Sequence, residues 1–304
     1  MPAGDRVGFV GLGVMGLPMA RNLARAGFTV CGWARRPEAV ERGRAEGIEM
    51  RPSLAEVAVA SDVVITMVTT SEDVVEVAIG EVGEGGLLES MAAGSVLVDM
   101  STVAPEVSRR VAAVAASRGV AFLDAPVSGG SFGAEQGTLT IMAGGDPAVL
   151  ERCRPVFAAV GEPDRLFHTG PVGSGEVVKL VNNMLVGSIS AATLEALLVG
   201  VRAGVSLKTL VDVVSVSSGG SVQLTGQLAK RALVGELDPG FATDLLVKDL
   251  RLAADLASEG GQDTPLTDVA RRLFEASQAA GHGRQDYTAL VVELTRGLSE
   301  ELRL

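Results

Sequence analysis

The sequence predicts a two-domain protein, in which an α/β domain with a parallel, doubly wound sheet precedes an all-helical domain. Short buried strands alternate with helical segments up to about residue 170, and beyond it helical periodicity alone continues. Alternation of strands and helices is typical of parallel sheets, whereas consecutive apolar-periodic segments predict helix-on-helix packing. We therefore expect domains at 1–170 and 171–304, joined by a long interdomain helix.

The elements of the first domain follow one another regularly. Helices are expected at 15–26, which Gly27 ends, and at 37–46, which Pro37 begins. Further helical segments lie between the later strands. Apolar runs typical of buried strands occur at 6–10, 28–33, 62–67, 95–99, 120–124, 138–145 and 165–170.

The second domain is expected to begin with a helix over residues 174–203, which would be about 45 Å long at 1.5 Å per residue. Glycine and proline clusters separate the segments that follow it. These segments are expected to be helices at 206–216, 221–234, 242–258, 265–280 and 285–302.

Composition excludes several classes of function. The chain has 304 residues and a net charge of −11, with no long basic run, which argues against nucleic acid or an anionic membrane as the main partner. Two cysteines and two histidines support neither a disulfide framework nor a metal cluster. Polar residues interrupt the longest apolar stretches, and no signal peptide precedes the first strand. We expect a soluble cytoplasmic protein.

A glycine-rich motif follows the first expected strand and opens the first expected helix. It reads Gly11-Leu12-Gly13-Val14-Met15-Gly16. In this context a GxGxxG motif predicts a Rossmann-type dinucleotide site, because its glycines permit a tight turn and a close approach of pyrophosphate to the helix N-terminus. A turn that serves packing alone is the alternative.

The end of the second strand bears on the choice of dinucleotide. An acidic residue about twenty positions beyond the glycines would bind the ribose hydroxyls of NAD. The chain has Trp33-Ala34-Arg35-Arg36 instead, and a guanidinium suits a 2′-phosphate. We expect NADP to be preferred over NAD, the alternative being two solvent-exposed arginines at a strand end.

A loop with uncovered backbone donors follows the strand at 120–124. In the sequence Asp124-Ala-Pro-Val-Ser-Gly-Gly130, Ser128 offers a hydroxyl, and Gly129 and Gly130 offer backbone N–H groups. Such a turn can hold a carboxylate by neutral donors alone. Its alternative is an ordinary loop.

Two charged positions occur on expected helices. Lys179 shares a helical face with Gly175, Asn182 and Asn183, in the pattern GxxxKxxNN. A half-buried lysine is costly unless its ammonium group finds partners, and the alternative is a side chain that extends to water. Lys248-Asp249 lies on an amphipathic helix, where the simplest interpretation is an exposed charge pair.

Taken in order, these motifs resemble one enzyme family. FVGLGVMGLPMA, WARR, DAPVSGG, GxxxKxxNN and KDL resemble the β-hydroxyacid dehydrogenases, which include 3-hydroxyisobutyrate dehydrogenase, tartronate semialdehyde reductase and the glyoxylate/succinic semialdehyde reductases. The resemblance covers about residues 6–295. One departure concerns the cofactor, because NADP-using members carry Asn-Arg-Thr where this chain has Ala34-Arg35-Arg36.

The resemblance implies roles for individual residues. Lys179 is similar to the family's catalytic lysine, Asn183 would orient substrate with Asn182 beside it, and Ser128 to Gly130 would bind the substrate carboxylate. It also implies that Asp286, in Asp-Tyr-Thr-Ala, anchors a helix near the site. The positions expected to bind cofactor are Gly11, Leu12, Gly13, Val14, Met15, Gly16, Arg35, Arg36, Met67, Val68, Thr102 and Lys248.

The function implied is an NADP-dependent oxidoreductase that interconverts a small β-hydroxy acid and its semialdehyde, with a lysine as acid and base. We expect a carboxylate-bearing substrate, and a homodimer or homotetramer formed through the helical domain. The alternatives are an imine-reductase-like enzyme, which usually has Asp or Tyr in place of the lysine, and a catalytically silent NADP-binding sensor. NADPH consumption with small semialdehydes separates them.

Overall fold

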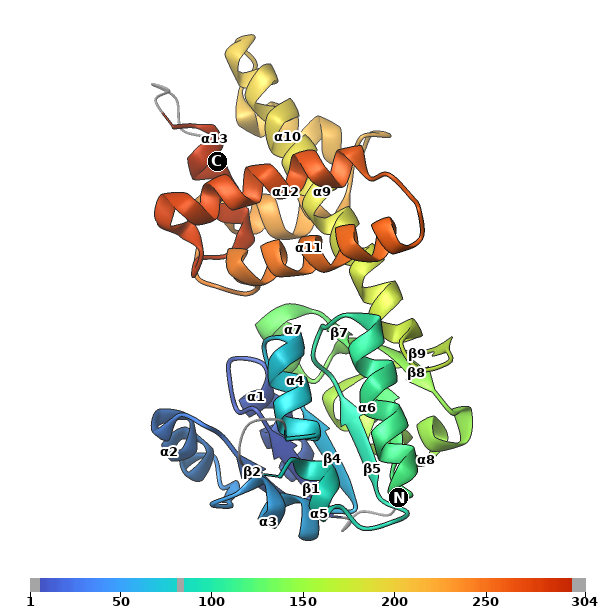
Figure 1. Cartoon of the computed structure of the whole chain (residues 1–304). Coiled ribbons are helices and arrows are strands. Elements are labelled where there is room, and N and C mark those ends of the chain that lie inside the picture. The colour runs from blue at the N-terminus through green and yellow to red at the C-terminus, as the bar shows by residue number, and fades with distance from the viewer. Residues whose placement is uncertain (1–5, 81–84, 297–304) are drawn as a thin grey trace. The chain divides into compact units, whose positions relative to one another are not determined.

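The computed structural model describes residues 6–80 and 85–296 of the chain, which form two compact units (Figure 1). The first unit is Met1–Lys179 and the second is Leu180–Leu304. Their boundary falls inside one continuous helix, α9 (Ser174–Arg202). The predicted fold class, a parallel-sheet α/β domain followed by helices with a long helix between them, is confirmed.

The first unit is built on a single sheet. Within the described residues the sheet has nine strands in the order β3-β2-β1-β4-β5-β6-β8-β7, and β9 pairs with β8. The first six strands are parallel, while β8 runs antiparallel to β6 and β7. The strands are β1 (Arg6–Val10), β2 (Thr29–Trp33), β3 (Glu49–Met50), β4 (Val63–Thr66), β5 (Val96–Asp99), β6 (Ala121–Asp124), β7 (Val127–Ser128), β8 (Leu139–Gly145) and β9 (Gly161–Gly170).

Helices cover both faces of this sheet, so its central strands β1, β4 and β5 are apolar on both sides. Val7 and Phe9 of β1 belong to one core with residues of α1 and α8, while Val10 packs in a second core with residues of α3 to α6. The buried free thiol of Cys153 lies in the first core and that of Cys31 in the second. The helices are α1 (Gly16–Arg25), α2 (Pro37–Ala45), α3 (Leu54–Val59), α4 (Ser71–Ala78), α5 (Leu87–Ser90), α6 (Pro105–Ser117), α7 (Gly130–Gln136) and α8 (Pro147–Val160).

The second unit packs its helices around a separate apolar core. Leu194 of α9, Leu246 of the KDL helix and Phe274 are completely buried there. After α9 its α-helices are α10 (Leu207–Ser215), α11 (Thr243–Glu259), α12 (Pro265–Ser277) and α13 (Leu290–Leu294).

For two segments of this unit, the prediction of one continuous helix was wrong. Residues 221–234 form a π-helical turn, Gln223–Leu228, and a 3₁₀ turn, Ala232–Val234, because the backbone at Arg231 leaves the helical region (φ −131°, ψ −74°). Thr225 and Gly226 are also weak helix formers. Residues 285–302 contain a 3₁₀ turn, Tyr287–Ala289, and the short α13, while 297–304 lie outside the described residues.

Helix α9 is unusually apolar along its length. By length and composition it could cross a membrane, with a mean hydropathy of 1.8 in its most apolar window. Its polar residues Asn182 and Asn183 are instead hydrogen-bonded, Asn183 to Asp249 of α11. Its later residues Ala191, Leu194 and Leu197 pack in the core of the second unit, so we interpret that part of α9 as a helix of this unit.

Candidate functional site: a dinucleotide cavity, a buried lysine and a polar cluster

The three glycines of the phosphate-type loop have distinct roles. Gly11 has a positive φ of 99°, and a side chain there would collide with the carbonyl oxygen of Met67. A side chain on Gly16 would collide with the loop itself and with Phe9, so this glycine lets α1 pack against β1. Gly13 faces open space, with no described atom within 4 Å of an added Cβ. The loop therefore leaves open space at the start of α1, where the sequence predicts that a phosphate group binds.

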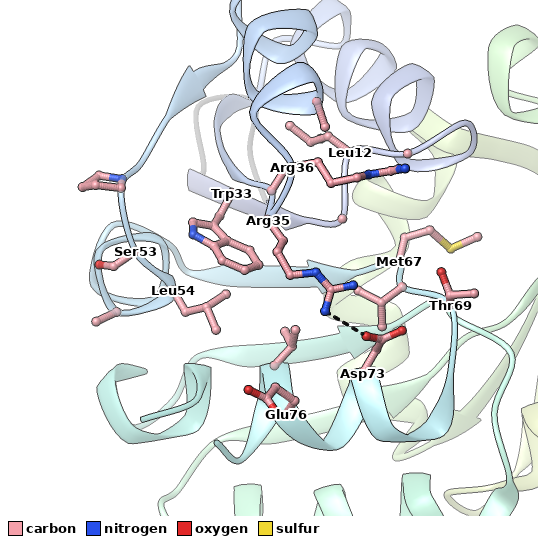
Figure 2. Close-up of a pocket in the computed structure, with 18 of the residues that line it drawn as sticks. Leu12, Trp33, Arg35, Arg36, Ser53, Leu54, Met67, Thr69, Asp73 and Glu76 are labelled. Carbon is pink, nitrogen blue, oxygen red and sulfur yellow. Dashed lines mark hydrogen bonds and ion pairs between the residues drawn. The ribbon is translucent and has the colours of Figure 1, made fainter. Parts of the chain in front are cut away.

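A cavity of about 650 Å³ opens beside this loop. Figure 2 shows Trp33 and Leu54 on one side of it, with Arg35 and Arg36 extending from the end of β2. Gly11, Leu12, Gly13, Met67 and Val68, all predicted to bind cofactor, also line it. Its aromatic and aliphatic wall and its two guanidinium groups suit the adenosine end of a dinucleotide.

The guanidinium group of Arg35 has one described partner in this cavity. Arg35 Nη1 lies 3.5 Å from Asp73 Oδ1, and the Arg35 side chain is 79% exposed. The second oxygen of Asp73 accepts hydrogen bonds from the backbone and hydroxyl of Thr70, which caps α4. A long, exposed ion pair contributes little, so Arg35 can turn to a phosphate at small cost.

The loops that follow β4 and β5 are tied together by Ser101. The Ser101 hydroxyl accepts the N–H of Val68 at 3.0 Å and donates to Asp99 Oδ1 at 2.6 Å. Thr102, predicted to lie near the cofactor, is partly accessible while its neighbours Ser101 and Val103 are buried. The carboxyl ends of parallel strands are where doubly wound sheets bind ligands.

The predicted carboxylate loop becomes accessible at the expected residues. Residues 122–127 are buried, whereas Ser128, Gly129 and Gly130 are not. Gly129 and Gly130 have φ values of 141° and 60°, which disfavour residues with a side chain. The backbone thus turns from β7 into α7 through two glycines that are at least partly accessible.

Asp124, at the end of β6, holds the start of α9. Its Oδ1 accepts the N–H of Gly173 at 2.7 Å, and its Oδ2 accepts that of Glu176 at 3.2 Å. Burial raises the pKa of Asp124 to about 6, although these backbone hydrogen bonds lower it. Gly175 packs so closely that a Cβ would collide with the carbonyl oxygen of Met142 and lie 2.8 Å from Asp124 Oδ2.

Lys179 lies one turn after this anchored start. Its side chain is buried, with 8% exposed, so it does not extend freely to water. Glu176, three residues earlier, is completely buried, and its Oε2 accepts the N–H of Val103 at 3.1 Å. Together Asp124 and Glu176 fix the helix turn that presents Lys179.

Within the second unit, the predicted Asn182, Asn183 and Lys248 belong to one polar chain. Asn182 donates to Asn183 Oδ1 at 3.0 Å, and Asn183 donates to Asp249 Oδ2 at 2.6 Å. Lys248 Nζ lies 2.9 Å from Asp249 Oδ1. Because Asp249 is 1% exposed, the interpretation of Lys248-Asp249 as an exposed pair is wrong.

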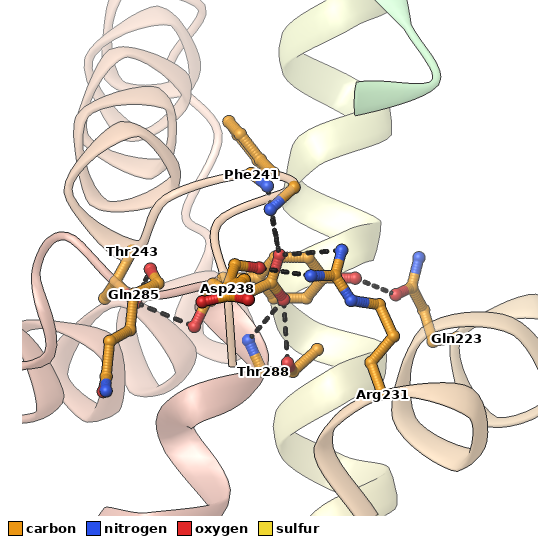
Figure 3. A network of polar contacts seen from close by, with 10 residues as sticks. Gln223, Arg231, Asp238, Phe241, Thr243, Gln285 and Thr288 are labelled. Atoms are coloured by element: carbon orange, nitrogen blue, oxygen red, sulfur yellow. Dashed lines mark hydrogen bonds and ion pairs between the residues drawn. The ribbon is translucent and has the colours of Figure 1, made fainter. Parts of the chain in front are cut away.

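Asp286 anchors the segment that leads into α11. Its carboxylate accepts the N–H groups of Gly240 and Phe241 at 3.0 Å and the hydroxyl of Thr288 at 2.7 Å. Figure 3 shows this network, in which Arg231 also contacts Asp286 and donates to the carbonyl of Asp238. Asp286 therefore fixes the segment just before the N-terminus of α11, the helix that carries Lys248 and Asp249.

Sequence reasoning assigned no site role to Asp73, Glu176 or Asp249. Asp73 has a local signal, because Thr70-x-x-Asp73 before an apolar run predicts a helix cap. Asp249 and Glu176 have a weaker signal, since each is an acid near the apolar residues of an expected helix. Their partners lie 66 and 73 residues away along the chain, which a sequence pattern does not reveal.

Two family models match nearly the whole chain. The first, described as the NAD-binding domain of 6-phosphogluconate dehydrogenase, covers residues 6–170. The second, described as NAD-binding of NADP-dependent 3-hydroxyisobutyrate dehydrogenase, covers residues 173–294.

Individual proteins are similar over the same length. The 2-(hydroxymethyl)glutarate dehydrogenase of Eubacterium barkeri is 40% identical, over 94% of this chain and 93% of that protein. The NAD-dependent L-serine dehydrogenase of Pseudomonas aeruginosa is 36% identical, over 94% and 96%. The structure of Mycobacterium tuberculosis 3-hydroxyisobutyrate dehydrogenase with L-serine superposes with a TM-score of 0.84 at 33% identity, covering 96% of this chain and 99% of that one.

Proposed function

The chain belongs to the β-hydroxyacid dehydrogenase family, and from this premise we propose that it oxidises a small carboxylate-bearing β-hydroxy acid, or reduces its semialdehyde, with NADP(H) preferred. Residues 1–170 would bind the dinucleotide. Residues 171–304 would complete the substrate site and form the subunit interface. The observation that carries the proposal is a buried lysine, Lys179, in the same unit as the cavity beside the glycine loop.

The cofactor would be held by the glycine loop and by the arginines at the end of β2. When bound, its nicotinamide supplies or accepts the hydride. NADP preference is supported by Arg35 and Arg36 in the cavity, where an acid would favour NAD. Thr102, Met67 and Val68 lie at the ends of β5 and β4 and would bind nearer the nicotinamide. Lys248, on α11, is the remaining cofactor contact that we propose.

Lys179 would act as the acid and base of the reaction. A lysine ammonium at hydrogen-bonding distance stabilises the negative charge that develops on the substrate oxygen, and in reduction it delivers the proton. Asn183 would orient that oxygen, with Asn182 supporting it, because the Asn183 side chain is itself held by Asp249. The donors of Ser128, Gly129 and Gly130 would hold the substrate carboxylate.

The names of the similar proteins narrow the substrate class. 2-(Hydroxymethyl)glutarate, L-serine and 3-hydroxyisobutyrate all carry a hydroxymethyl group on the carbon next to a carboxylate. They differ only in the other substituent of that carbon. We therefore propose a 2-substituted 3-hydroxypropanoate as the substrate of this chain.

A substrate panel tests this proposal. 3-Hydroxyisobutyrate, L-serine, 2-(hydroxymethyl)glutarate and 4-hydroxybutyrate would be oxidised with NADP and with NAD. The matched control is the methyl ester of 3-hydroxyisobutyrate, which has the same reacting group but no charge. We expect kcat/KM for the ester to be about 10- to 100-fold lower, the value of a lost charge-assisted hydrogen bond. Equal values for acid and ester would contradict the carboxylate site.

The same assay separates the alternative functions. An imine reductase would consume NADPH with a cyclic imine and leave semialdehydes untouched. A silent sensor would bind NADPH, as measured by nicotinamide fluorescence, without turnover of any compound in the panel.

We also propose a homodimer or homotetramer formed through the second unit. Along the face of α9 opposite its core contacts, Val181, Leu185 and Val199 are 48, 56 and 64% exposed. A row of exposed apolar residues on a central helix is typical of a subunit interface. The similar proteins are named as dehydrogenases of small molecules, and from this we propose a cytoplasmic location.

A further inference from the structure

The loop between β5 and α6, residues 101–104, is held by side chains from three different elements. The N–H of Ser101 donates to Asp99 Oδ1 at 3.2 Å, and the N–H of Ala104 donates to Ser71 at 3.3 Å. Between them, the N–H of Val103 donates to Glu176 Oε2 at 3.1 Å. A buried loop outside the sheet needs such partners, because an unsatisfied backbone donor is costly.

Glu176 makes this bond over a long distance in the sequence. An acid in the first turn of a helix is favoured by the helix dipole, and it commonly folds back onto the backbone N–H before its own helix. Here the N–H of Gly173 is already bonded to Asp124, and Glu176 instead reaches a residue 73 positions away. A completely buried carboxylate used in this way fixes one segment against another.

The turn that carries Glu176 has little freedom of its own. Asp124 accepts the N–H groups of Gly173 and Glu176. Gly175 leaves no space for even a methyl group against β8 and Asp124. The bond between Glu176 and Val103 therefore joins the 101–104 loop directly to a fixed turn of α9.

We infer that Glu176 is a positioning residue that sets the loop carrying Thr102 against the helix turn carrying Lys179. Glu176 and Lys179 are three residues apart and therefore neighbours on α9. This inference rests on the proposed function, in which Thr102 lies beside the nicotinamide and Lys179 exchanges a proton with substrate. The relative placement of the groups for hydride and proton transfer then depends in part on the hydrogen bond between Glu176 and the N–H of Val103, although Glu176 itself would touch neither cofactor nor substrate.

Three substitutions of Glu176 separate the effect of its side-chain length from the effect of its charge. Glu176→Gln keeps the length and an acceptor oxygen, Glu176→Asp keeps the charge but shortens the side chain, and Glu176→Ala removes both. Val111→Ala is the matched control, because Val111 is completely buried on α6 of the same unit and has no part in the loop. Thermal unfolding would show whether the control loses as much stability as Glu176→Ala.

The first measurement is amide hydrogen exchange of residues 100–105 in the protein without cofactor. For the amides of residues 100–104 (Pro105 has none), we expect exchange to be at least tenfold faster in Glu176→Ala and Glu176→Asp, and close to wild type in Glu176→Gln and Val111→Ala. This readout needs no turnover, so it tests the inference even if the proposed function fails. Unchanged exchange in the Ala and Asp variants would overturn the inference.

The second measurement is steady-state kinetics with the best substrate of the panel. We expect kcat to fall about 10- to 100-fold in the Ala and Asp variants, because small misplacements of reacting groups are costly, while KM for NADPH changes less than threefold. Glu176→Gln should restore kcat. An equal loss of kcat in Glu176→Ala and Val111→Ala would show that Glu176 only stabilises the fold and does not position the loop. If Lys179→Ala keeps its kcat, the proposed function fails instead.

Discussion

Asp99 and Asp124 are register partners at the carboxyl ends of β5 and β6, and both are buried. Asp99 accepts hydrogen bonds from Ser101 and from the hydroxyl of Thr66, and so holds the loop that follows its own strand. Asp124 instead holds the start of α9. Two paired strand ends thus position the two segments that carry Thr102 and Lys179.

The pKa of Asp124 makes stability depend on pH in a defined direction. Burial raises this pKa from 3.8 to about 6, so the folded state binds a proton more tightly than the unfolded chain. The free energy of unfolding should therefore fall as pH rises from about 4 to about 6, by an amount on the order of 3 kcal/mol from this group. Asp124→Asn should remove that slope, measured by urea unfolding at several pH values.

Asp62 provides the control for this experiment, because its pKa is shifted the other way. The hydrogen bond from Arg6 lowers the pKa of Asp62, so its contribution is present at neutral pH and lost as pH falls. In Asp62→Asn, the free energy of unfolding should fall between pH 4 and 6 at least as steeply as in wild type. If the free energy of unfolding of Asp124→Asn still falls between pH 4 and 6, a group other than Asp124 is responsible for the pH dependence.

Arg35→Ala should weaken NADPH binding by about 1–3 kcal/mol, the value of a charge-assisted contact, and leave NADH binding almost unchanged. The reason is that Arg35 lies in the cavity and its ion pair with Asp73 is long and exposed. Fluorescence titration with both cofactors measures the change. Arg42→Ala, an exposed arginine of α2 outside the cavity, is the control. Equal losses for NADPH and NADH would contradict binding of the 2′-phosphate by Arg35.

Lys179→Ala should fold and bind NADPH normally, but its kcat should fall by about 10²–10⁴, the usual range for a positioned acid and base. Stopped-flow measurement of NADPH oxidation gives the rate. Lys208→Ala is the control, because Lys208 is exposed and pairs with Asp212 on α10. Near wild-type turnover at pH 7 would show that Lys179 is a buried structural lysine.

Leu185→Glu should convert the oligomer to a monomer, because it places a charge in the exposed apolar row of α9. Sedimentation velocity measures the mass. Glu236→Lys, an exposed charge change elsewhere in the second unit, should leave the mass unchanged. A wild-type protein that sediments as a monomer would refute the interface at the outset.

The sequence predicted the features that depend on near neighbours. The predicted bounds of β1 and β2 differ from the observed bounds by at most one residue, because local spacing encodes these strands. The glycine turn and the two arginines after β2 were recognised from the same local pattern. The bonds of Glu176 to Val103 and of Asn183 to Asp249 could not be predicted, since packing alone brings such distant residues together. The break at Arg231 was missed because one partner of its side chain, Asp286, lies far away in the sequence.

The separation of the two apolar cores on either face of the sheet has a practical consequence. Cys31 and Cys153, the two cysteines of the sequence, lie one in each core, and the second unit has none. Burial raises the pKa of the Cys153 thiol to about 11, so thiol reagents must wait for that face to open. The labelling rate of Cys153 therefore reports how fast one face of the sheet opens, and that of Cys31 reports the opening of the other face. Unfolding confined to the helical unit would leave both thiols unlabelled.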